Sequence, residues 1–513
     1  MKGYEIFREA LRELKLGPVF GNPGSTEIPM LRGVDDYILT LHDSLAVGMA
    51  DGYAQFSGRP ALVNLHAMPG VANSMAFIHT ARQNHSPVII TAGQQDTRHA
   101  YYEPLLWHDL QSLVGDAAKY SYEVKSAEDI EKAMKRAYSI SLEPPMGPVF
   151  LSFPMDVMDL EADYNRAGYS VPNTSLVDSD AVEYVLRCIS ESRSPAVIMG
   201  GELDEYGMLD KAEHFANRFG CQVFAEPFAS RAPFRSSNER FSGDLAPATS
   251  SINMSLLSHD LILNFGGDLT MYPYLPSRLL PGKKIITVSL SPSYRHGEYI
   301  TSNPGLFMEA LENRVGKIGN YRRESDLSGR SAAAREKKSM GASYVIAKAR
   351  NSFSRHVIVD EAISSSPLVR STMGYRDKSY FTAKSGQLGW GLPAAAGISL
   401  HSPKVLEIVG DGALMYTIQT LWTISHYNLP VKILVLNNEG YTILKSFSRS
   451  FYPGVENAPY FTFRNDISSI SESFGVPSRI ADKDLRELDW LAEGSGPKLL
   501  VANVSKDIPA LFP

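Results

Sequence analysis

VLEIVGDGALMYTIQTLWTISHYNLPVKILVLNNEGYTIL, residues Val405 to Leu444, is the stretch that decides the fold. One apolar run ends at Gly410-Asp411-Gly412, and a second, Val431 to Leu436, ends at Asn437-Asn438. The amphipathic segment between them predicts a helix, so the stretch predicts two parallel strands joined through a helix. Because parallel strands place their carboxyl ends at one edge of a sheet, we expect Asp411 and Asn438 to lie close together.

This predicted corner has the chemistry of a magnesium site. A carboxylate and an amide oxygen are ligands that Mg²⁺ accepts, and a bound phosphate supplies further oxygens. Gly412 allows backbone N–H groups to approach such a phosphate where the helix begins. Gly-Asp-Gly and Asn-Asn are also ordinary turn and loop sequences. Their order, with the twenty-four residues from Ala413 to Leu436 between them, favours the metal site.

Composition limits the class of protein. The chain has 513 residues, 44% of them hydrophobic, which predicts a large soluble protein of two to four domains. A net charge of -6 gives no electrostatic footprint for nucleic acid or for a membrane surface. Cys188 and Cys221 have no metal-ligand spacing, and the amino-terminal residues predict an amphipathic helix rather than a signal peptide. No apolar run is long enough to cross a bilayer, so we expect a cytoplasmic location.

Polar residues follow several predicted strands in the first third of the chain. The loop GNPGSTE, from Gly21 to Glu27, is typical either of a capped turn before a helix or of a ligand-binding loop. Asp43 begins a predicted helix, where its simplest role is to cap that helix. His66 follows the predicted strand Ala61 to Leu65, and is either a satisfied polar group or a residue that transfers protons.

Strands and helices alternate along the whole chain, which predicts an α/β protein with three domains, each a mainly parallel sheet flanked by helices. We expect a first domain over residues 1–165, a central domain over 175–315 and a third domain over 341–513. The charged, serine-rich stretch 316–340 predicts an exposed linker. Gly266-Gly267 has no further glycine motif of a nucleotide site, so we interpret it as structural.

Five further motifs resemble those of benzoylformate decarboxylases and related thiamine diphosphate-dependent decarboxylases. They are GNPGSTE at Gly21, DGYAQ at Asp51, NLHAMPG at Asn64, NHSPVIITAGQQ at Asn84 and GPVFLSFP at Gly147. With the GDG and NN motifs they span nearly the whole chain. The resemblance implies the thiamine diphosphate-binding fold, with a pyrimidine-binding first domain and a third domain that binds diphosphate and Mg²⁺. Some relatives bind FAD in the central domain, but no feature of this sequence requires it, so FAD is not expected.

The resemblance also implies roles for individual residues, carried over from the matching motifs. The implied metal ligands are Asp411, Asn438 and the carbonyl of Gly440. The implied catalytic residues are Asp43, His66 and Ser25. The implied cofactor-binding residues are Asn22, Pro23, Asn73, Ser364, Ser365, Leu388, Gly412, Ala413, Tyr441 and Ile443. Among these, Leu388 matches the apolar residue that holds the cofactor bent, and Ile443, Leu444 and Phe447 match the substrate pocket wall. From the residues alone, Leu388 is equally typical of a core, and a serine run is typical of a solvated loop.

Two positions depart from the family pattern. Asp43 stands where relatives carry an activating glutamate, one methylene longer, so its carboxylate reaches the pyrimidine only if the helix shifts inward or a water bridges the gap. The second active-site histidine of benzoylformate decarboxylases falls near Tyr272-Pro273-Tyr274, where this chain has none. Trp107 and His108 are candidates for lining the pocket, with His108 as a replacement acid, although both are also typical of a surface loop.

These observations lead to a first hypothesis: thiamine diphosphate- and Mg²⁺-dependent, non-oxidative decarboxylation of a 2-keto acid with an aromatic or bulky side chain. One alternative is a carboligase of the acetolactate synthase type, since loss of the second histidine slows protonation after CO₂ leaves. Another is a non-catalytic member of the superfamily. The resemblance implies a homodimer or homotetramer with its site at the subunit interface. The net charge and the lack of a long apolar run give no reason to expect a nucleic acid or a membrane partner.

Overall fold

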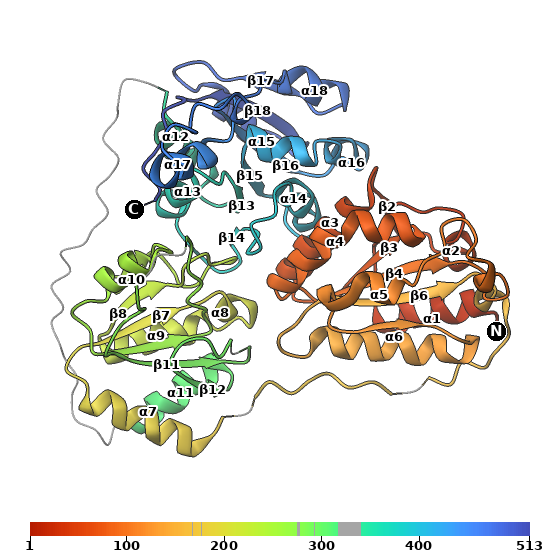
Figure 1. Cartoon of the computed structure of the whole chain (residues 1–513), viewed down its shortest axis with the longest axis horizontal. Coiled ribbons are helices and arrows are strands. Elements are labelled where there is room, and N and C mark those ends of the chain that lie inside the picture. The colour runs from red at the N-terminus through yellow and green to blue at the C-terminus, as the bar shows by residue number, and fades with distance from the viewer. Residues whose placement is uncertain (167, 176, 274–276, 292, 316–339, 513) are drawn as a thin grey trace.

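A computed structural model describes residues 1–166, 168–175, 177–273, 277–291, 293–315 and 340–512. Its named strands form three six-stranded sheets, and all of the pairings between these strands are parallel. Helices flank each sheet, and the three units lie around a shared centre (Figure 1). The predicted α/β class with three parallel sheets is therefore confirmed.

The first sheet has the strand order β2-β1-β3-β4-β6-β5. Its strands are β1 (Val19–Gly21), β2 (Tyr37–Leu39), β3 (Ala61–Leu65), β4 (Val88–Gln94), β5 (Ser121–Glu123) and β6 (Val149–Pro154). The accompanying helices are α1 (Gly3–Leu14), α2 (Ile28–Leu31), α3 (Asp43–Ser57), α4 (Ala67–Gln83), α5 (Leu110–Val114) and α6 (Ala127–Leu142), with short 3-10 turns at Ala100–Tyr102, Gly115–Ala117 and Val157–Asp159. The central strands β3, β4 and β6 are buried along their whole length, as expected for a sheet covered on both faces.

The middle sheet has the order β12-β11-β10-β7-β8-β9. Its elements are α7 (Ser179–Glu191), β7 (Pro195–Met199), α8 (Glu202–Glu205), α9 (Leu209–Phe219), β8 (Gln222–Ala225), β9 (Phe241–Asp244), α10 (Thr249–Ser255), β10 (Leu261–Phe265), β11 (Lys284–Ser289), β12 (Glu298–Thr301) and α11 (Pro304–Val315). A Cβ atom on Gly200 would lie 2.1 Å from the carbonyl oxygen of Gly266, so the loops after β7 and β10 touch through their backbones. This close approach gives Gly266 a packing role, in line with the structural interpretation. Both cysteines are free and buried.

The third sheet has the order β14-β13-β15-β16-β18-β17. Its elements are α12 (Ala342–Phe353), β13 (Val357–Glu361), α13 (Ser366–Met373), β14 (Tyr380–Phe381), α14 (Gly391–Ser399), β15 (Val405–Gly410), α15 (Asp411–Tyr416), α16 (Thr420–His426), β16 (Val431–Asn437), α17 (Thr442–Phe451), a 3-10 turn (Pro459–Phe461), α18 (Ile467–Ser473), β17 (Ser478–Ile480), α19 (Glu487–Ala492) and β18 (Lys498–Asn503). The segment between β15 and β16 is two short helices, α15 and α16, where the sequence predicted one amphipathic helix. No helix among the described residues is long and apolar enough to cross a membrane.

Helices α3 and α14 join the first and third units, and they lie side by side in Figure 1. A Cβ atom on Gly52 would lie 2.3 Å from the carbonyl oxygen of Ala394, and one on Gly397 would lie 1.9 Å from that of Met49. Both glycines therefore let the two helix backbones approach more closely than larger residues would allow. One hydrophobic cluster runs continuously through this contact, from Phe20 to Val501.

Lys384 joins the middle unit to the third. Its ammonium group lies 3.4 Å from a carboxylate oxygen of Glu226, which is 2% exposed, and its backbone N–H donates to the side-chain oxygen of Asn84 in the first unit. Glu226 also accepts N–H groups from Gly201 and Asp268, so two backbone donors and the Lys384 ammonium group contact this buried side chain. One lysine thus contributes to the contacts among all three units.

The change Lys384→Met leaves the buried Glu226 carboxylate without its cation, and we expect it to lower the free energy of unfolding by about 3 kcal/mol. Denaturant titration of the purified protein measures this loss. Lys211→Met is the matched control, because Lys211 pairs with Glu309 near the surface, where an ion pair contributes little. Equal losses in the two variants would contradict a special role for Lys384.

The boundaries of the three domains stay predictions. The predicted linker lies outside the described residues except for Met340, whose carbonyl accepts an N–H group from Ser505. Of the three residues where a second histidine was sought, Tyr274 lies outside the described part, while Tyr272 and Pro273 lie within it.

Candidate active site

The ends of β15 and β16 form the polar corner that the sequence predicts. In the parallel register Gly410 lies opposite Leu436, so Asp411 and Asn438 follow neighbouring strand ends. Asp411 is 3% exposed, and burial raises the pKa of its carboxyl group to about 6, although nearby backbone N–H groups, including that of Asn438, favour the charged form. The side-chain oxygen of Asn438 is buried and, within the described residues, has no hydrogen-bond partner.

These donors fit a magnesium ion. A carboxylate, a buried amide oxygen without a partner and the Gly440 carbonyl together form an oxygen-only ligand set, which Mg²⁺ prefers. A Cβ atom on Gly412 would lie 2.7 Å from the Tyr441 ring, so only glycine fits where the chain turns into α15. The N–H groups at the start of α15 are then open to a phosphate beside the ion.

One pocket brings together every third-domain residue that the resemblance implies for the cofactor or the metal. These ten residues are Ser364, Ser365, Leu388, Asp411, Gly412, Ala413, Asn438, Gly440, Tyr441 and Ile443. They come from four separate segments of the chain, which meet because β13, β15 and β16 are adjacent strands of one sheet. The residues implied in the first domain do not line this pocket.

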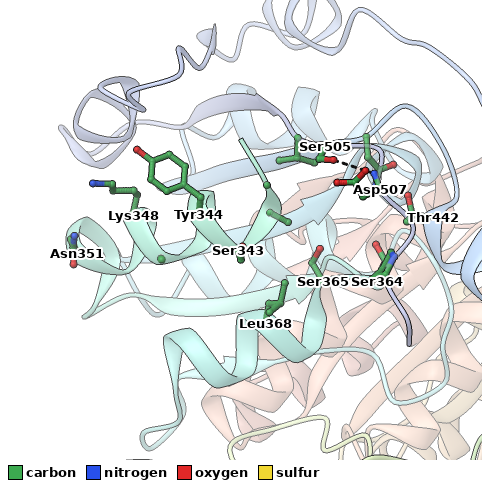
Figure 2. Close-up of a pocket in the computed structure, with 16 residues that line it drawn as sticks. Ser343, Tyr344, Lys348, Asn351, Ser364, Ser365, Leu368, Thr442, Ser505 and Asp507 are labelled. Atoms are coloured by element: carbon green, nitrogen blue, oxygen red, sulfur yellow. Dashed lines mark hydrogen bonds between the residues drawn. The ribbon is translucent and has the colours of Figure 1, made fainter. Parts of the chain in front are cut away.

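A larger cavity of about 550 Å³ adjoins the pocket and shares Ser364, Ser365, Asn438 and Thr442 with it. In Figure 2 the side chains of Ser364, Ser365 and Thr442 lie near Ser505 and Asp507 of the carboxyl-terminal tail. Its volume lies within the range of small-molecule sites. Hydroxyl groups from the segment just before α13 and from the start of α17 therefore face open space beside the metal corner.

Glu27 organises the corresponding edge of the first sheet. Its carboxylate is fully buried and accepts N–H groups from Gly24 at 2.8 Å, Ala67 at 3.0 Å and Gly93 at 2.8 Å. The same carboxylate lies 2.8 Å from Nδ1 of His66. Of the two readings of the GNPGSTE loop, the capped turn is wrong, because Glu27 is the N-cap residue of α2 and no side chain caps that helix.

Sequence reasoning missed Glu27 as a site residue. Its only signal is its place in the GNPGSTE loop. Besides the neighbouring Thr26 hydroxyl, four groups from three separate segments of the chain contact it. The contact at Nδ1 leaves Nε2 of His66 as the ring nitrogen able to exchange a proton. The His66 side chain is 23% exposed, so it remains accessible.

We expect Glu27→Leu to lower the free energy of unfolding by roughly 3 kcal/mol or more, because two buried N–H groups and one partly buried N–H group lose their acceptor. Denaturant titration measures the loss. Glu27→Gln keeps an acceptor oxygen and is expected to cost less. A Leu variant as stable as the wild type would show that these N–H groups find other partners.

Asp43 does not cap α3, which corrects the simplest reading of the sequence. His42 is the N-cap residue, and its Nδ1 accepts the N–H group of Ser44. Asp43 instead accepts the backbone N–H of His66 at 3.0 Å, and its Oδ1 lies 2.4 Å from where a Cβ atom on Gly70 would stand. The fold thus brings Asp43 and His66 together, with the Asp43 side chain buried.

The other first-domain residues are more open. Pro23, Ser25 and Asn73 are exposed, and Asn22 is half-buried. All of them lie at the carboxyl ends of β1 and β3 or in the helix that follows. They form, with Asp43 and His66, an open group of residues that is separate from the third-domain pocket.

The predicted pocket wall lies beside the middle unit. The rings of Tyr272 and Phe447 are stacked with their centroids 6.2 Å apart, and Phe512 also contacts both rings. A phenol therefore lies beside Phe447, where relatives are expected to carry a histidine. Trp107 is half-buried and His108 is exposed.

Comparisons with known proteins cover all three units. The family models for the thiamine pyrophosphate enzyme match as follows: the N-terminal TPP-binding domain over residues 1–118, the central domain over 182–311 and the C-terminal TPP-binding domain over 368–501. A benzoylformate decarboxylase from Pseudomonas aeruginosa is 33% identical over 486 residues, which is 91% of this chain and 92% of that protein.

Two further similarities bear on the family. The structure of a thiamine diphosphate-dependent 4-hydroxybenzoylformate decarboxylase from Rhodococcus jostii superposes with a TM-score of 0.92 at 30% identity, covering 99% of this chain and all of that one. The acetolactate synthase large subunit of Haemophilus influenzae is 24% identical over 527 residues, or 94% of this chain and 90% of that protein. The matched domains, the identity over nearly the full length and the shared three-sheet fold show that this chain belongs to the thiamine pyrophosphate enzyme family.

Proposed function

We propose that the protein is a thiamine diphosphate- and Mg²⁺-dependent decarboxylase of a 2-keto acid with an aromatic or bulky side chain, such as benzoylformate. The observation that carries the proposal is the buried side-chain oxygen of Asn438 beside Asp411, which has no hydrogen-bond partner among the described residues and lies in the pocket that also contains Leu388. Similarity to benzoylformate decarboxylases over nearly the whole chain supports this substrate class.

The third-domain pocket would hold the cofactor. Asp411, Asn438 and the Gly440 carbonyl are suited to bind Mg²⁺, with Ser364, Ser365, Gly412 and Ala413 around the diphosphate. Leu388, Tyr441 and Ile443 would flank the rings. When bound, thiamine diphosphate supplies the electron sink that accepts the bonding electrons as CO₂ leaves the keto acid.

The first-domain residues would handle protons. Conversion of a keto acid to an aldehyde and CO₂ requires one proton at the former carbonyl carbon. Nε2 of His66 can deliver it, because Glu27 holds the other ring nitrogen. The Asp43 carboxylate would polarise the aminopyrimidine, with Asn22, Pro23 and Asn73 around that ring and Ser25 toward the substrate.

A second copy of the chain would complete the site. Asp43 and His66, the proposed proton-transfer residues, do not line the cofactor pocket of the same chain. We therefore infer a homodimer or homotetramer in which the first domain of one subunit faces the third domain of another. The exposed apolar side chains of Ile28, Leu41 and Leu444 suit burial at such an interface. Two free cysteines suit a reducing compartment and support a cytoplasmic location.

The test is to supply purified protein with thiamine diphosphate, Mg²⁺ and a panel of aromatic 2-keto acids. The expected result is release of CO₂ and formation of the corresponding aldehyde, with benzoylformate or a close relative as the best substrate. Failure to turn over any acid of the panel would overturn the proposal.

A carboligase is the second candidate, favoured by Tyr272 beside Phe447 in place of a histidine and by the similarity to acetolactate synthase. In that case the carbon left after CO₂ loss joins an aldehyde or a second keto acid instead of accepting a proton. Mass spectrometry of the products separates a hydroxy ketone from an aldehyde. A non-catalytic protein would instead show no acceleration of proton exchange at C2 of the cofactor.

A further inference from the structure

Two buried glutamates lie beneath the loop that carries Leu388. Glu407 stands in the middle of β15 with a fully buried side chain, and within the described residues neither of its carboxyl oxygens has a hydrogen-bond partner. Glu361 is the last residue of β13 and is 2% exposed. A buried carboxyl group without any partner is costly when charged, so Glu407 calls for an explanation.

The two carboxyl groups converge on one point. Glu407 is paired with Val359 on the neighbouring parallel strand, so Glu361 lies two residues further along β13 and on the same face of the sheet. A Cβ atom on Gly391 would lie 2.7 Å from Oε1 of Glu407 and 2.8 Å from Oε2 of Glu361. Only a glycine therefore fits over the pair, at the first residue of α14.

Hydrogen bonds distinguish the two glutamates. Glu361 accepts N–H groups from Gly389 at 2.5 Å, Trp390 at 3.2 Å and Gly391 at 2.8 Å, which favours its charged form. Glu407 accepts none from the part of the chain that the structure describes, and burial and the neighbouring Glu361 raise its pKa well above the usual range. Burial also raises the pKa of Glu361, to about 7.

The surroundings offer little compensating charge. Asp360 precedes Glu361 on β13 and adds a further carboxyl group, hydrogen-bonded to Tyr380 and acted on by the positive charge of Arg370. From the α3 side, Asp51 accepts the indole N–H of Trp390. Glu361 and Glu407 therefore lie in a region rich in carboxyl groups. At neutral pH at most one of these two glutamates is charged.

We propose that Glu361 and Glu407 form an acid pair that keeps one proton, with Glu407 as the protonated member, and that this pair positions the loop 388–391 beneath the cofactor. Both glutamates are positioning residues, because Glu361 acts through the loop N–H groups and Glu407 acts through Glu361. The proton assignment stands by itself, whereas the effect on the cofactor rests on the proposed function.

The pair makes two properties depend on pH. Above about pH 4.5, the ordinary pKa of glutamate, the unfolded chain releases a proton that the folded state keeps. The free energy of unfolding therefore falls as the pH rises. Loss of that proton also places two negative charges side by side. Their repulsion weakens the hydrogen bonds that Glu361 accepts from the loop N–H groups. Affinity for thiamine diphosphate is therefore expected to fall at alkaline pH, because Leu388 lines the cofactor pocket.

The first experiment uses the full chain without cofactor and compares the wild type with Glu407→Gln. The expected infrared difference spectrum contains a protonated carboxylic acid band that the variant lacks. The unfolding temperature of the variant is expected to exceed that of the wild type by a margin that widens from about pH 5 to about pH 8. Absence of the band, or a margin independent of pH, would overturn the acid pair.

The second experiment measures the Kd of thiamine diphosphate with Mg²⁺ across the same pH range and above it. Glu407→Gln has a side-chain amide that can donate to the Glu361 carboxylate, so it is expected to bind as the wild type does near neutral pH but without the alkaline loss. Glu407→Leu removes the donor and is expected to weaken binding about tenfold at every pH. An unchanged Kd for the Leu variant, or the same alkaline loss in the Gln variant, would overturn the positioning role.

Glu202→Gln is the matched control. Glu202 is also buried, and burial raises its pKa to about 8, but it lies in the middle unit and bonds to Ser289 and Leu290. Its variant is expected to leave the alkaline loss of cofactor affinity unchanged, and a Glu202 effect as large as that of Glu407 would overturn the positioning role. A wild type that binds no cofactor would contradict the proposed function and the positioning role together, while the first experiment still decides the acid pair.

Discussion

Replacing Asp411 with alanine is expected to weaken Mg²⁺-dependent binding of thiamine diphosphate by more than about 100-fold, because even the loss of an outer partner of a metal site costs about 10- to 100-fold. Asp411 is the one carboxylate of the predicted ligand set, and it lies at the start of α15 where the phosphate is expected. Calorimetric titration of cofactor in the presence of Mg²⁺ measures the change.

Two neighbouring asparagines provide the control. Asn438→Ala removes the unpartnered oxygen at the corner and is expected to act in the same direction as Asp411→Ala. Asn437→Ala changes the preceding residue, whose side-chain amide instead donates to Asn503. It is expected to bind the cofactor almost as the wild type does. Equal effects of the two asparagine changes would contradict the assigned metal corner.

The change Asp43→Asn is expected to lower kcat by about 10²- to 10⁴-fold, the range that a positioned proton-transfer group contributes. Asparagine keeps the size of the side chain and can still accept the N–H of His66, so the fold is expected to remain intact. It cannot carry the charge that the aminopyrimidine requires. Steady-state decarboxylation with saturating cofactor measures the change, and circular dichroism checks the fold.

Two variants sharpen this prediction. Asp43→Glu restores the longer side chain of the relatives and is expected to keep or raise activity, provided α3 and Gly70 yield slightly to the added methylene. Asp35→Asn changes an exposed carboxylate of the same domain and is expected to have no effect. An Asp43→Asn enzyme as active as the wild type would show that another group activates the cofactor.

Local patterns predicted much of the fold. The strands Ala61–Leu65, Val405–Gly410 and Val431–Asn437 follow directly from short apolar runs bounded by turn residues. The corner at Asp411 and Asn438 was also accessible, because strand, helix and strand in sequence leave few arrangements in space. The third-domain residues that line one pocket were found through their motifs. Their roles stay predictions until the variants above are measured.

Side-chain partners from distant segments could not be predicted. Sequence reasoning gave Glu27 no site role, yet its carboxylate contacts groups of Gly24, His66 and Gly93, which come from three separate segments. Asp43 appeared to be a cap, yet the preceding His42 takes that role, because the Asp43 side chain turns toward His66. Glu407 lies between the buried residues Leu406 and Ile408 in β15, and no sequence motif indicated a role for it.

The sequence by itself determined the three parallel sheets and the polar strand ends, since apolar periodicity and turn residues act over a few positions of the chain. Its motifs also determined the family, through their resemblance to those of known relatives. Only the tertiary structure decided which carboxyl groups meet N–H groups, which meet a histidine and which meet each other. The reason is physical: the state of a buried carboxyl group depends on desolvation and on neighbours within a few ångströms. In this protein those neighbours come from strands and loops that are far apart in the sequence.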